Sequence, residues 1–213
     1  MNQEEKPTKR EQSKIIKNKQ LVLSAFILFF SGVFFYLTDM NLESKLSSHQ
    51  KFIFKTVNNR VFNVETVENH IKIKELNSKI IFLKVFGWNC EYCQKEIPEL
   101  IQLKNKFEGA FEIVSIEAQH HKQEEHLAFI KKHHINYHII DGDRQKKFLD
   151  YLKKIYHWDG VIPLTIVLNA KGKVLAFEVG YKSYSLTTLL QTTLKQLTQE
   201  AVPVPSKESE RSK

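Results

Sequence analysis

The sequence is poor in cysteine and proline. Its 213 residues include only two cysteines, Cys90 and Cys93, and five prolines. Two cysteines cannot form the framework of structural disulfides on which small, loop-rich secreted domains depend. The hydrophobic fraction of 42% and the charged fraction of 26% are those of an ordinary globular chain, which excludes the disordered and collagen-like classes. We therefore expect one folded domain with appendages, in which the two thiols act as a pair.

The sequence also has no block of basic residues. The net charge of +8 comes from 32 lysine and arginine residues against 24 aspartate and glutamate residues. The lysines are scattered among acidic residues, and no aromatic stacking motif accompanies them, whereas nucleic-acid-binding domains cluster their basic side chains. We therefore expect no nucleic-acid partner.

One segment has no charge at all. Residues 21–37 contain neither a charged side chain nor a proline, and a helix extended to Thr38 approaches the thickness of a bilayer. Basic side chains are concentrated before it, at Lys6, Lys9, Arg10, Lys14, Lys17 and Lys19, whereas residues 38–50 contain one, Lys45. The positive-inside rule then predicts a cytoplasmic N-terminus and an extracytoplasmic, periplasmic remainder.

Two alternatives to a membrane anchor fit this segment less well. A cleaved signal peptide ends in a small-x-small cleavage site, and residues 34–39 offer none. No cysteine follows that could carry a lipid. A buried core helix shows a polar face, whereas this segment is apolar all round. We expect a single-pass, uncleaved signal anchor in the inner (cytoplasmic) membrane.

The composition divides the chain into five parts. A polar stretch follows the anchor, and the C-terminal residues have the composition of a disordered tail. The interval between them has the length of one domain. The expected parts are a cytoplasmic basic N-terminus (1–20), a transmembrane signal anchor (21–38), a stalk (39–51), a folded domain (52–199) and a disordered tail (200–213).

Hydrophobic periodicity predicts an α/β fold for the domain. Short antiparallel strands are expected first, at 52–56, 60–64 and 71–76. Later strands are expected at 79–86, 111–118, 137–140, 161–168 and 174–180, and helices at 91–107, 123–134, 143–156 and 185–199. The run 79–86 is nearly all apolar, as in a buried central strand. This order predicts a mixed sheet flanked by helices on both faces, with extra N-terminal strands.

The cysteine pair lies where strand 79–86 gives way to helix 91–107. Free backbone N–H groups and the helix dipole lower the pKa of a thiol at a helix N-terminus. Cys90 would be the exposed nucleophile, and Cys93, one turn later and more buried, would attack the resulting mixed disulfide. We expect no cofactor beyond this redox-active disulfide.

The main alternative for a CxxC motif is half of a zinc site. Zinc would need two further ligands, which could come only from histidine. Six of the nine histidines lie between positions 120 and 138, at His120, His121, His126, His133, His134 and His138. They follow no fixed ligand spacing relative to the cysteines, so we expect surface histidines and no metal site. A metal-binding or chaperone module that uses this stretch is the alternative of a different functional class.

Two prolines complete a recognisable pattern. Pro98 lies within helix 91–107, five residues after Cys93, and Pro163 lies at the beginning of strand 161–168. A CxxC at a strand-to-helix turn, this helix proline and the downstream Ile162-Pro163 resemble the thioredoxin superfamily. The sequences 93–98 and 160–172 are further similar to its membrane-anchored TlpA-like and ResA-like branch, which includes the cytochrome c maturation reductases. The resemblance covers residues 52–199.

The resemblance implies a thioredoxin-like fold and roles for the residues that match. The Ile162-Pro163 bond would be cis, and the Ile162 backbone would lie against the cysteines, where an extended substrate segment could pair with it. Glu96 would be the acidic residue of the active-site helix that tunes the thiols or relays protons. The alternative for Glu96 is a solvent-facing helix position.

Three features depart from the common pattern of the superfamily. The dipeptide between the cysteines is Glu91-Tyr92, whereas this branch often has proline in the second place. Asn89 precedes the first cysteine, where tryptophan is usual, and Trp88 lies one position earlier. Lys84 occupies the place of the buried aspartate of cytosolic thioredoxins. We expect its ammonium group to reach solvent along an apolar stem. An ammonium group at Cys93 is the alternative, and it would favour the thiolate.

Together these features predict a membrane-anchored, extracytoplasmic thiol-disulfide oxidoreductase. The favoured version is a reductant of protein disulfides, with apocytochrome c as the substrate that the resemblance implies and a membrane-embedded thiol protein as electron donor. The alternative within this class is a disulfide oxidase or isomerase of the same fold.

Overall fold

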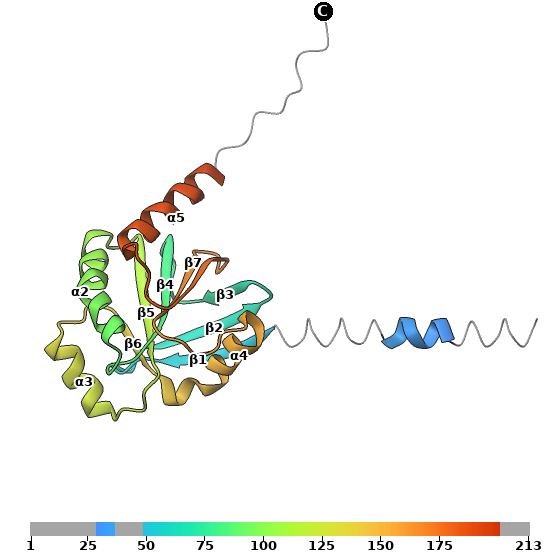
Figure 1. Cartoon of the computed structure of the whole chain (residues 1–213), viewed down its shortest axis with the longest axis horizontal. Coiled ribbons are helices and arrows are strands. Elements are labelled where there is room, and N and C mark those ends of the chain that lie inside the picture. Colours follow the sequence, from blue (N-terminus) through green and yellow to red (C-terminus); the bar gives the residue numbers. More distant parts are fainter. Residues whose placement is uncertain (1–28, 37–48, 201–213) are drawn as a thin grey trace, which may run out of the picture. The chain divides into compact units, whose positions relative to one another are not determined.

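The computed structural model describes residues 29–36 and 49–200 (Figure 1). Residues 29–36 are helical and exposed, and they belong to a different unit of the chain from the domain that follows. In these described ranges no helix combines the length and the apolarity that a membrane crossing requires. The predicted anchor (21–38) extends beyond the described residues, and the predicted segment 1–20 and most of the stalk and tail also lie outside them.

The domain begins with a small antiparallel sheet. Its strands are β1 (Gln50–Lys55), β2 (Val61–Val67) and β3 (His70–Ile73), paired in that order. Alternate side chains point inward, and Phe54 and Phe62 are fully buried. The alternation of apolar and polar residues therefore predicted the three strands, but β2 continues three residues beyond the expected end at 64, and β3 ends three residues before the expected end at 76.

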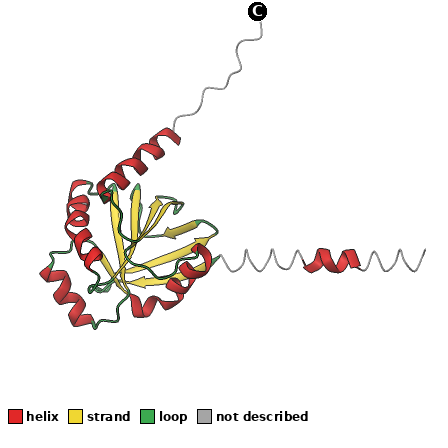
Figure 2. Ribbon diagram, in the orientation of Figure 1, coloured by secondary structure: helices red, strands yellow, loops and turns green. Residues whose placement is uncertain are grey.

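A five-stranded mixed sheet forms the centre of the domain, in the order β6-β5-β4-β7-β8 (Figure 2). Its strands are β4 (Ile80–Phe86), β5 (Phe111–Glu117), β6 (His138–Asp141), β7 (Leu164–Asn169) and β8 (Val174–Val179). The first three are parallel, and β7 and β8 run antiparallel to their neighbours. Every residue of the central strand β4 is buried, as its apolar run predicted.

Helices cover both faces of this sheet, as predicted. On one face α2 (Glu91–Lys106), α3 (Gln123–Lys132) and α5 (Leu186–Glu200) pack over a core that contains Phe82 and Phe111. On the other face α4 (Lys146–Tyr156) shares the cover with the small sheet. The extra N-terminal strands are therefore part of the hydrophobic core.

Two further predicted boundaries are wrong for reasons that the structure shows. The helix expected at 143–156 begins as a 3-10 turn, η1 (Gly142–Gln145), and Asp141 rather than Asp143 caps it by accepting a hydrogen bond from the Asp143 N–H at 3.0 Å. The strand expected from position 161 begins at Leu164, since Pro163 has no N–H to donate to a ladder. The Pro163 carbonyl still accepts a hydrogen bond from the Gly180 N–H at 2.8 Å.

Backbone contacts tie the small sheet to the central one at two places. Thr56, after β1, forms a bridge with Ile140 of β6. At the other place the Val174 N–H donates to the Asn69 carbonyl at 3.1 Å. Gly172, in the β7–β8 turn, has a φ of +87°, and a Cβ there would lie 2.8 Å from the Lys72 backbone, so this close approach requires glycine.

Candidate active site

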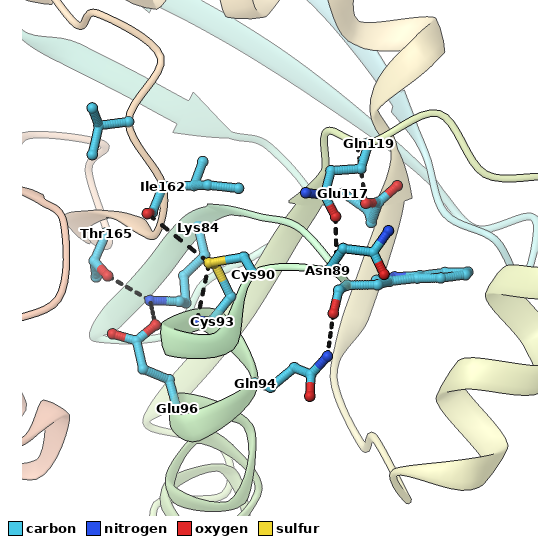
Figure 3. Close-up of a disulfide and its surroundings, with 12 residues drawn as sticks. Lys84, Asn89, Cys90, Cys93, Gln94, Glu96, Glu117, Gln119, Ile162 and Thr165 are labelled. Carbon is cyan, nitrogen blue, oxygen red and sulfur yellow. Dashed lines mark hydrogen bonds and ion pairs between the residues drawn. A yellow bond between two sulfur atoms is a disulfide. The ribbon is translucent and has the colours of Figure 1, made fainter.

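The two cysteines lie at the N-terminus of α2 and form a disulfide, with their Cα atoms 5.2 Å apart (Figure 3). Cys90 is the N-cap residue, and its Sγ accepts a hydrogen bond from the Cys93 N–H at 3.2 Å. Cys90 is partly exposed, whereas Cys93 is buried. The turn after β4 thus presents the first sulfur at the surface and holds the second in the interior.

The segment Ile162-Pro163 meets the cysteine pair. Ile162 lies next to Cys90 although the two residues are 72 positions apart in the sequence. The Ile162-Pro163 peptide bond is cis. The carbonyl oxygen of Ile162 lies 4.0 Å from the Sγ of Cys90. The structure therefore has the arrangement that the resemblance implied for these two residues.

Lys84 does not reach solvent, so the expectation for it is wrong. Its residue is 1% exposed in the middle of β4, because both faces of that central strand are covered. The Nζ lies 2.9 Å from the Oε2 of Glu96 and donates a hydrogen bond to the Thr165 Oγ1 at 2.5 Å. Burial lowers the pKa of Lys84, and the carboxylate of Glu96 opposes that effect.

Glu96 also points inward, which excludes the solvent-facing alternative. It is 7% exposed and shares the inner face of α2 with Cys93, Ile97 and Leu100, which follow the helical spacing of three and four residues. Burial, followed by the charge of Glu96, raises the pKa of Tyr137. The structure thus places an internal ion pair beside the disulfide (Figure 3).

Two glutamine side chains that the sequence did not single out form hydrogen bonds with the turn between β4 and α2. The Asn89 N–H donates to the Gln119 Oε1 at 2.8 Å, and the side-chain amide of Gln94 donates to the Trp88 carbonyl. Gln119 comes two residues after β5, which runs parallel to β4. The sequence did contain a signal for it, because the carboxyl ends of parallel strands meet at one edge of a sheet.

Part of the histidine-rich stretch packs around Trp88. The indole stacks between His121 and Phe129, at ring-centroid distances of 3.9 Å and 4.6 Å, and His126 meets it edge-on. The expectation of a surface histidine is wrong for His126, which is buried, and right for His120, which is exposed and contacts Asp143. Within residues 29–36 and 49–200, no group of three His, Cys, Asp or Glu side chains is placed to hold a metal ion.

Comparison with known proteins identifies the family that the chain matches and a similar protein. The model of the AhpC/TSA family matches residues 55–177. The thiol-disulfide oxidoreductase ResA of Bacillus subtilis (strain 168) is 29% identical over 124 residues, which are 57% of this chain and 65% of that relative. The match thus spans less than two thirds of the relative's length. Both findings confirm the resemblance to ResA-like members of the thioredoxin superfamily.

Solved structures confirm the thioredoxin-like α/β fold. A candidate thioredoxin from Neisseria meningitidis has a TM-score of 0.53 and 14% identity, and the match covers 70% of this chain and 90% of that one. The exposed lipoprotein thioredoxin Etrx1 of Streptococcus pneumoniae strain TIGR4 has a TM-score of 0.50 and 15% identity, with 68% and 99% covered.

Proposed function

The chain belongs to the AhpC/TSA family of thioredoxin-like proteins, and from that premise we propose that it is a thiol-disulfide oxidoreductase that acts through Cys90 and Cys93. One observation carries the proposal: a CxxC disulfide caps the N-terminus of α2, with the sulfur of the partly exposed Cys90 beside the Ile162 carbonyl. An inert structural disulfide would not need its outer sulfur at such a position.

The reduced pair would transfer two electrons to a disulfide substrate in two exchanges. The Cys90 thiolate, stabilised by the N–H groups of the first helical turn, attacks one sulfur of the substrate disulfide. The S–S bond of the substrate breaks, and a mixed disulfide forms between Cys90 and the attacked sulfur. The leaving substrate thiolate takes up a proton. Cys93 loses its proton and attacks the Cys90 Sγ, which releases the second substrate thiol and leaves the Cys90–Cys93 disulfide.

Lys84 and Glu96 are proposed as positioning residues for the second exchange. Cys93 is buried, so its proton must pass to a nearby group before it can attack, and this internal ion pair lies beside it. Glu96→Gln should therefore move the pH profile of mixed-disulfide resolution and leave the attack by Cys90 nearly unchanged. Glu108→Gln, at an exposed turn after the same helix, is the matched control. Identical pH profiles for the two variants would contradict this role.

We also propose the cellular setting, which the sequence alone supports. The uncharged segment 21–37 and the basic residues before it favour a signal anchor in the inner membrane, with the domain outside the cytoplasm. A membrane thiol protein would then re-reduce the disulfide, and protein disulfides such as those of apocytochrome c would be the substrates.

Two measurements on the full chain test the activity and its direction. Cys93→Ser should accumulate mixed disulfides with substrate, whereas Cys90→Ser should form none, and a double variant that still reduces disulfides would refute the mechanism. The reduction potential of the pair, equilibrated against glutathione and dithiothreitol, should be about −250 mV or lower for a reductant. A value near about −130 mV would instead identify an oxidase or isomerase.

A further inference from the structure

An open groove lies at the opposite end of the central sheet from the disulfide. It is lined by Lys79, which directly precedes β4, and by Asn169, the last residue of β7, which pairs with Ile80. Cys90 follows the other end of β4, so the seven residues of that strand separate the groove from the cysteine pair by about 20 Å. The groove has a volume of about 720 Å³, which is within the range of small-molecule sites.

Helix α5 supplies the apolar wall of the groove. The first half of the helix is held in the core, where Leu186 and Leu190 are buried. The same spacing of three and four residues continues to Leu194 and Leu197, which are only half-buried and line the groove. Figure 1 shows that α5 continues beyond the ends of β4 and β5. The apolar stripe of the helix is therefore longer than the sheet that it covers.

The uncharged polar groups of the groove are used within the chain. The Thr198 hydroxyl donates to the Leu194 carbonyl at 2.7 Å. The side-chain oxygen of Asn169 accepts hydrogen bonds from the N–H groups of Lys171 and Lys173 at 2.9 Å and 3.0 Å. A ligand rich in hydroxyl or amide groups would therefore find few partners here, and a peptide main chain would find few as well.

Three lysines surround the apolar wall. Lys79, Lys171 and Lys195 are exposed, and they come from three separate segments of the chain, so a basic run in the sequence does not account for them. No acidic side chain is among the described residues that line the groove. In the part of the chain that the structure describes, none of these three ammonium groups is paired with a carboxylate. Their charges complement an anionic group next to an apolar one.

We propose that this groove binds a fatty acid, with its aliphatic chain against Leu194 and Leu197 and its carboxylate among the three lysines. Each methylene group that enters an apolar site adds up to about fourfold in affinity, and the ammonium groups select the charge of the head group. A cationic amphiphile of the same length would be repelled. This inference goes beyond the proposed function and does not depend on it, since the two sites lie at opposite ends of the sheet.

Photo-crosslinking to the full chain in phosphatidylcholine nanodiscs tests the inference. The two probes are a dodecanoate and a dodecyltrimethylammonium ion, each with a diazirine near the end of its alkyl chain. Mass spectrometry should find the dodecanoate on peptides that contain residues 169–171 and 194–198, at about ten times the yield of the cationic probe. In Lys195→Glu this ratio should fall at least about threefold, because the charge of one ammonium group is reversed. The comparison between variants cancels any difference in how the two probes enter the bilayer.

Lys153→Glu provides the matched control, since Lys153 is likewise an exposed lysine on a helix, α4. This variant should keep the ratio of the unmodified protein. Dodecanoate labels that are absent from the groove peptides, or equal ratios in Lys195→Glu and the unmodified protein, would overturn the inference. Labelling of the groove only after removal of residues 201–213 would also overturn it, because the chain's own C-terminal residues would then be the occupant.

The thiol chemistry is measured separately. Lys195→Glu should reduce disulfides at the rate of the unmodified protein, because Lys195 lies far from Cys90. Loss of the dodecanoate labels would therefore leave the proposed function intact, and a failure of the Cys90 and Cys93 variants to behave as expected would leave this inference intact.

Discussion

The Nζ of Lys84 and the Oε2 of Glu96 lie 2.9 Å apart in the interior, and this ion pair joins the central strand β4 to the active-site helix α2. Taking two charges out of water costs several kcal/mol per ion, which their mutual attraction and added hydrogen bonds must offset. The Thr165 hydroxyl supplies one such bond to Lys84. Removing one partner is therefore expected to cost far more than the pair itself contributes.

Glu96→Gln should lower the free energy of unfolding by about 3–5 kcal/mol at pH 7, because it leaves the Lys84 ammonium buried without its carboxylate. The loss should shrink as the pH rises to 9.5. The pKa of Lys84 is already lowered by burial, and without Glu96 it falls further, so folded Lys84 gives up its proton before the unfolded chain does at about 10.4. Urea unfolding of the oxidised protein at both pH values measures this.

The control for this experiment is Glu91→Gln, whose carboxylate pairs with Lys95 on the exposed side of α2. An exposed pair and a first-turn carboxylate each contribute little, so this variant should lose far less stability than Glu96→Gln at both pH values. A Glu96→Gln loss that stays the same from pH 7 to 9.5 would show that Lys84 keeps its proton without its partner.

His138 should make the domain less stable in mild acid. Burial lowers its pKa, the carboxylate of Glu112 opposes this, and the cations Arg60 and Lys104 add to it. As the pH falls from 7 to 5, the unfolded chain takes up a proton that the folded chain binds less readily, so stability falls. The free energy of unfolding of His138→Gln should fall less over this range than that of the unmodified protein.

The control is His49→Gln, at an exposed position, which should behave like the unmodified protein. An equal fall in all three proteins would rule out His138 as the cause.

Glu99 of α2 should stabilise the start of α5. Its carboxylate accepts hydrogen bonds from the N–H groups of Leu186 and Thr187 at 3.2 Å and 2.8 Å, and from the Thr187 hydroxyl at 2.7 Å. Loss of a helix cap and of a negative charge at a helix N-terminus costs about 1–2 kcal/mol, which is the loss expected for Glu99→Ala. Hydrogen exchange should accelerate in the first turn of α5, and Glu108→Ala, at an exposed turn, should leave it unchanged. Protection of these amides that survives in Glu99→Ala would contradict the capping role.

Gly142→Ala should destabilise the domain by about 3 kcal/mol, at the upper end of the usual cost of overpacking. The added Cβ would overlap the backbone carbonyl of Glu117, and a backbone atom cannot move aside as a side chain can. Gly109→Ala is the control, because it meets open space and incurs only the strain of its positive φ, about 1 kcal/mol. Equal losses in thermal unfolding would show that β5 shifts freely to accommodate the methyl group.

The sequence predicted the parts of the site that depend on local pattern. Cys90 and Cys93 lie at a strand-to-helix turn that their neighbours define, and the order of the three motifs implied that Ile162 and Pro163 would meet them. The extra N-terminal strands also followed from simple alternation. In each case the information that predicts the structure lies either within a few neighbouring residues or in an order of motifs that is typical of one fold.

The sequence could not predict side-chain interactions between two elements when no motif links the two partners. A lysine stem is long enough to reach either solvent or an internal carboxylate, and only the packing of α2 on β4 decides the outcome for Lys84. The same holds for Glu99, which caps a helix 87 positions away from it in the chain. His126 is buried because α3 turns it toward Trp88, and no local spacing encodes that rotation.

The two backbone ties between the sheets also protect the domain from self-association. Strands β6 and β8 are the outermost strands of the central sheet, where free N–H and C=O groups could template pairing with a second molecule. The bridge from Thr56 to Ile140 occupies part of one border, and the bridge from His70 to Lys173 occupies the approach to the other. The N-terminal strands therefore shield part of both borders of the central sheet, and a domain truncated to that sheet would expose them to a second molecule.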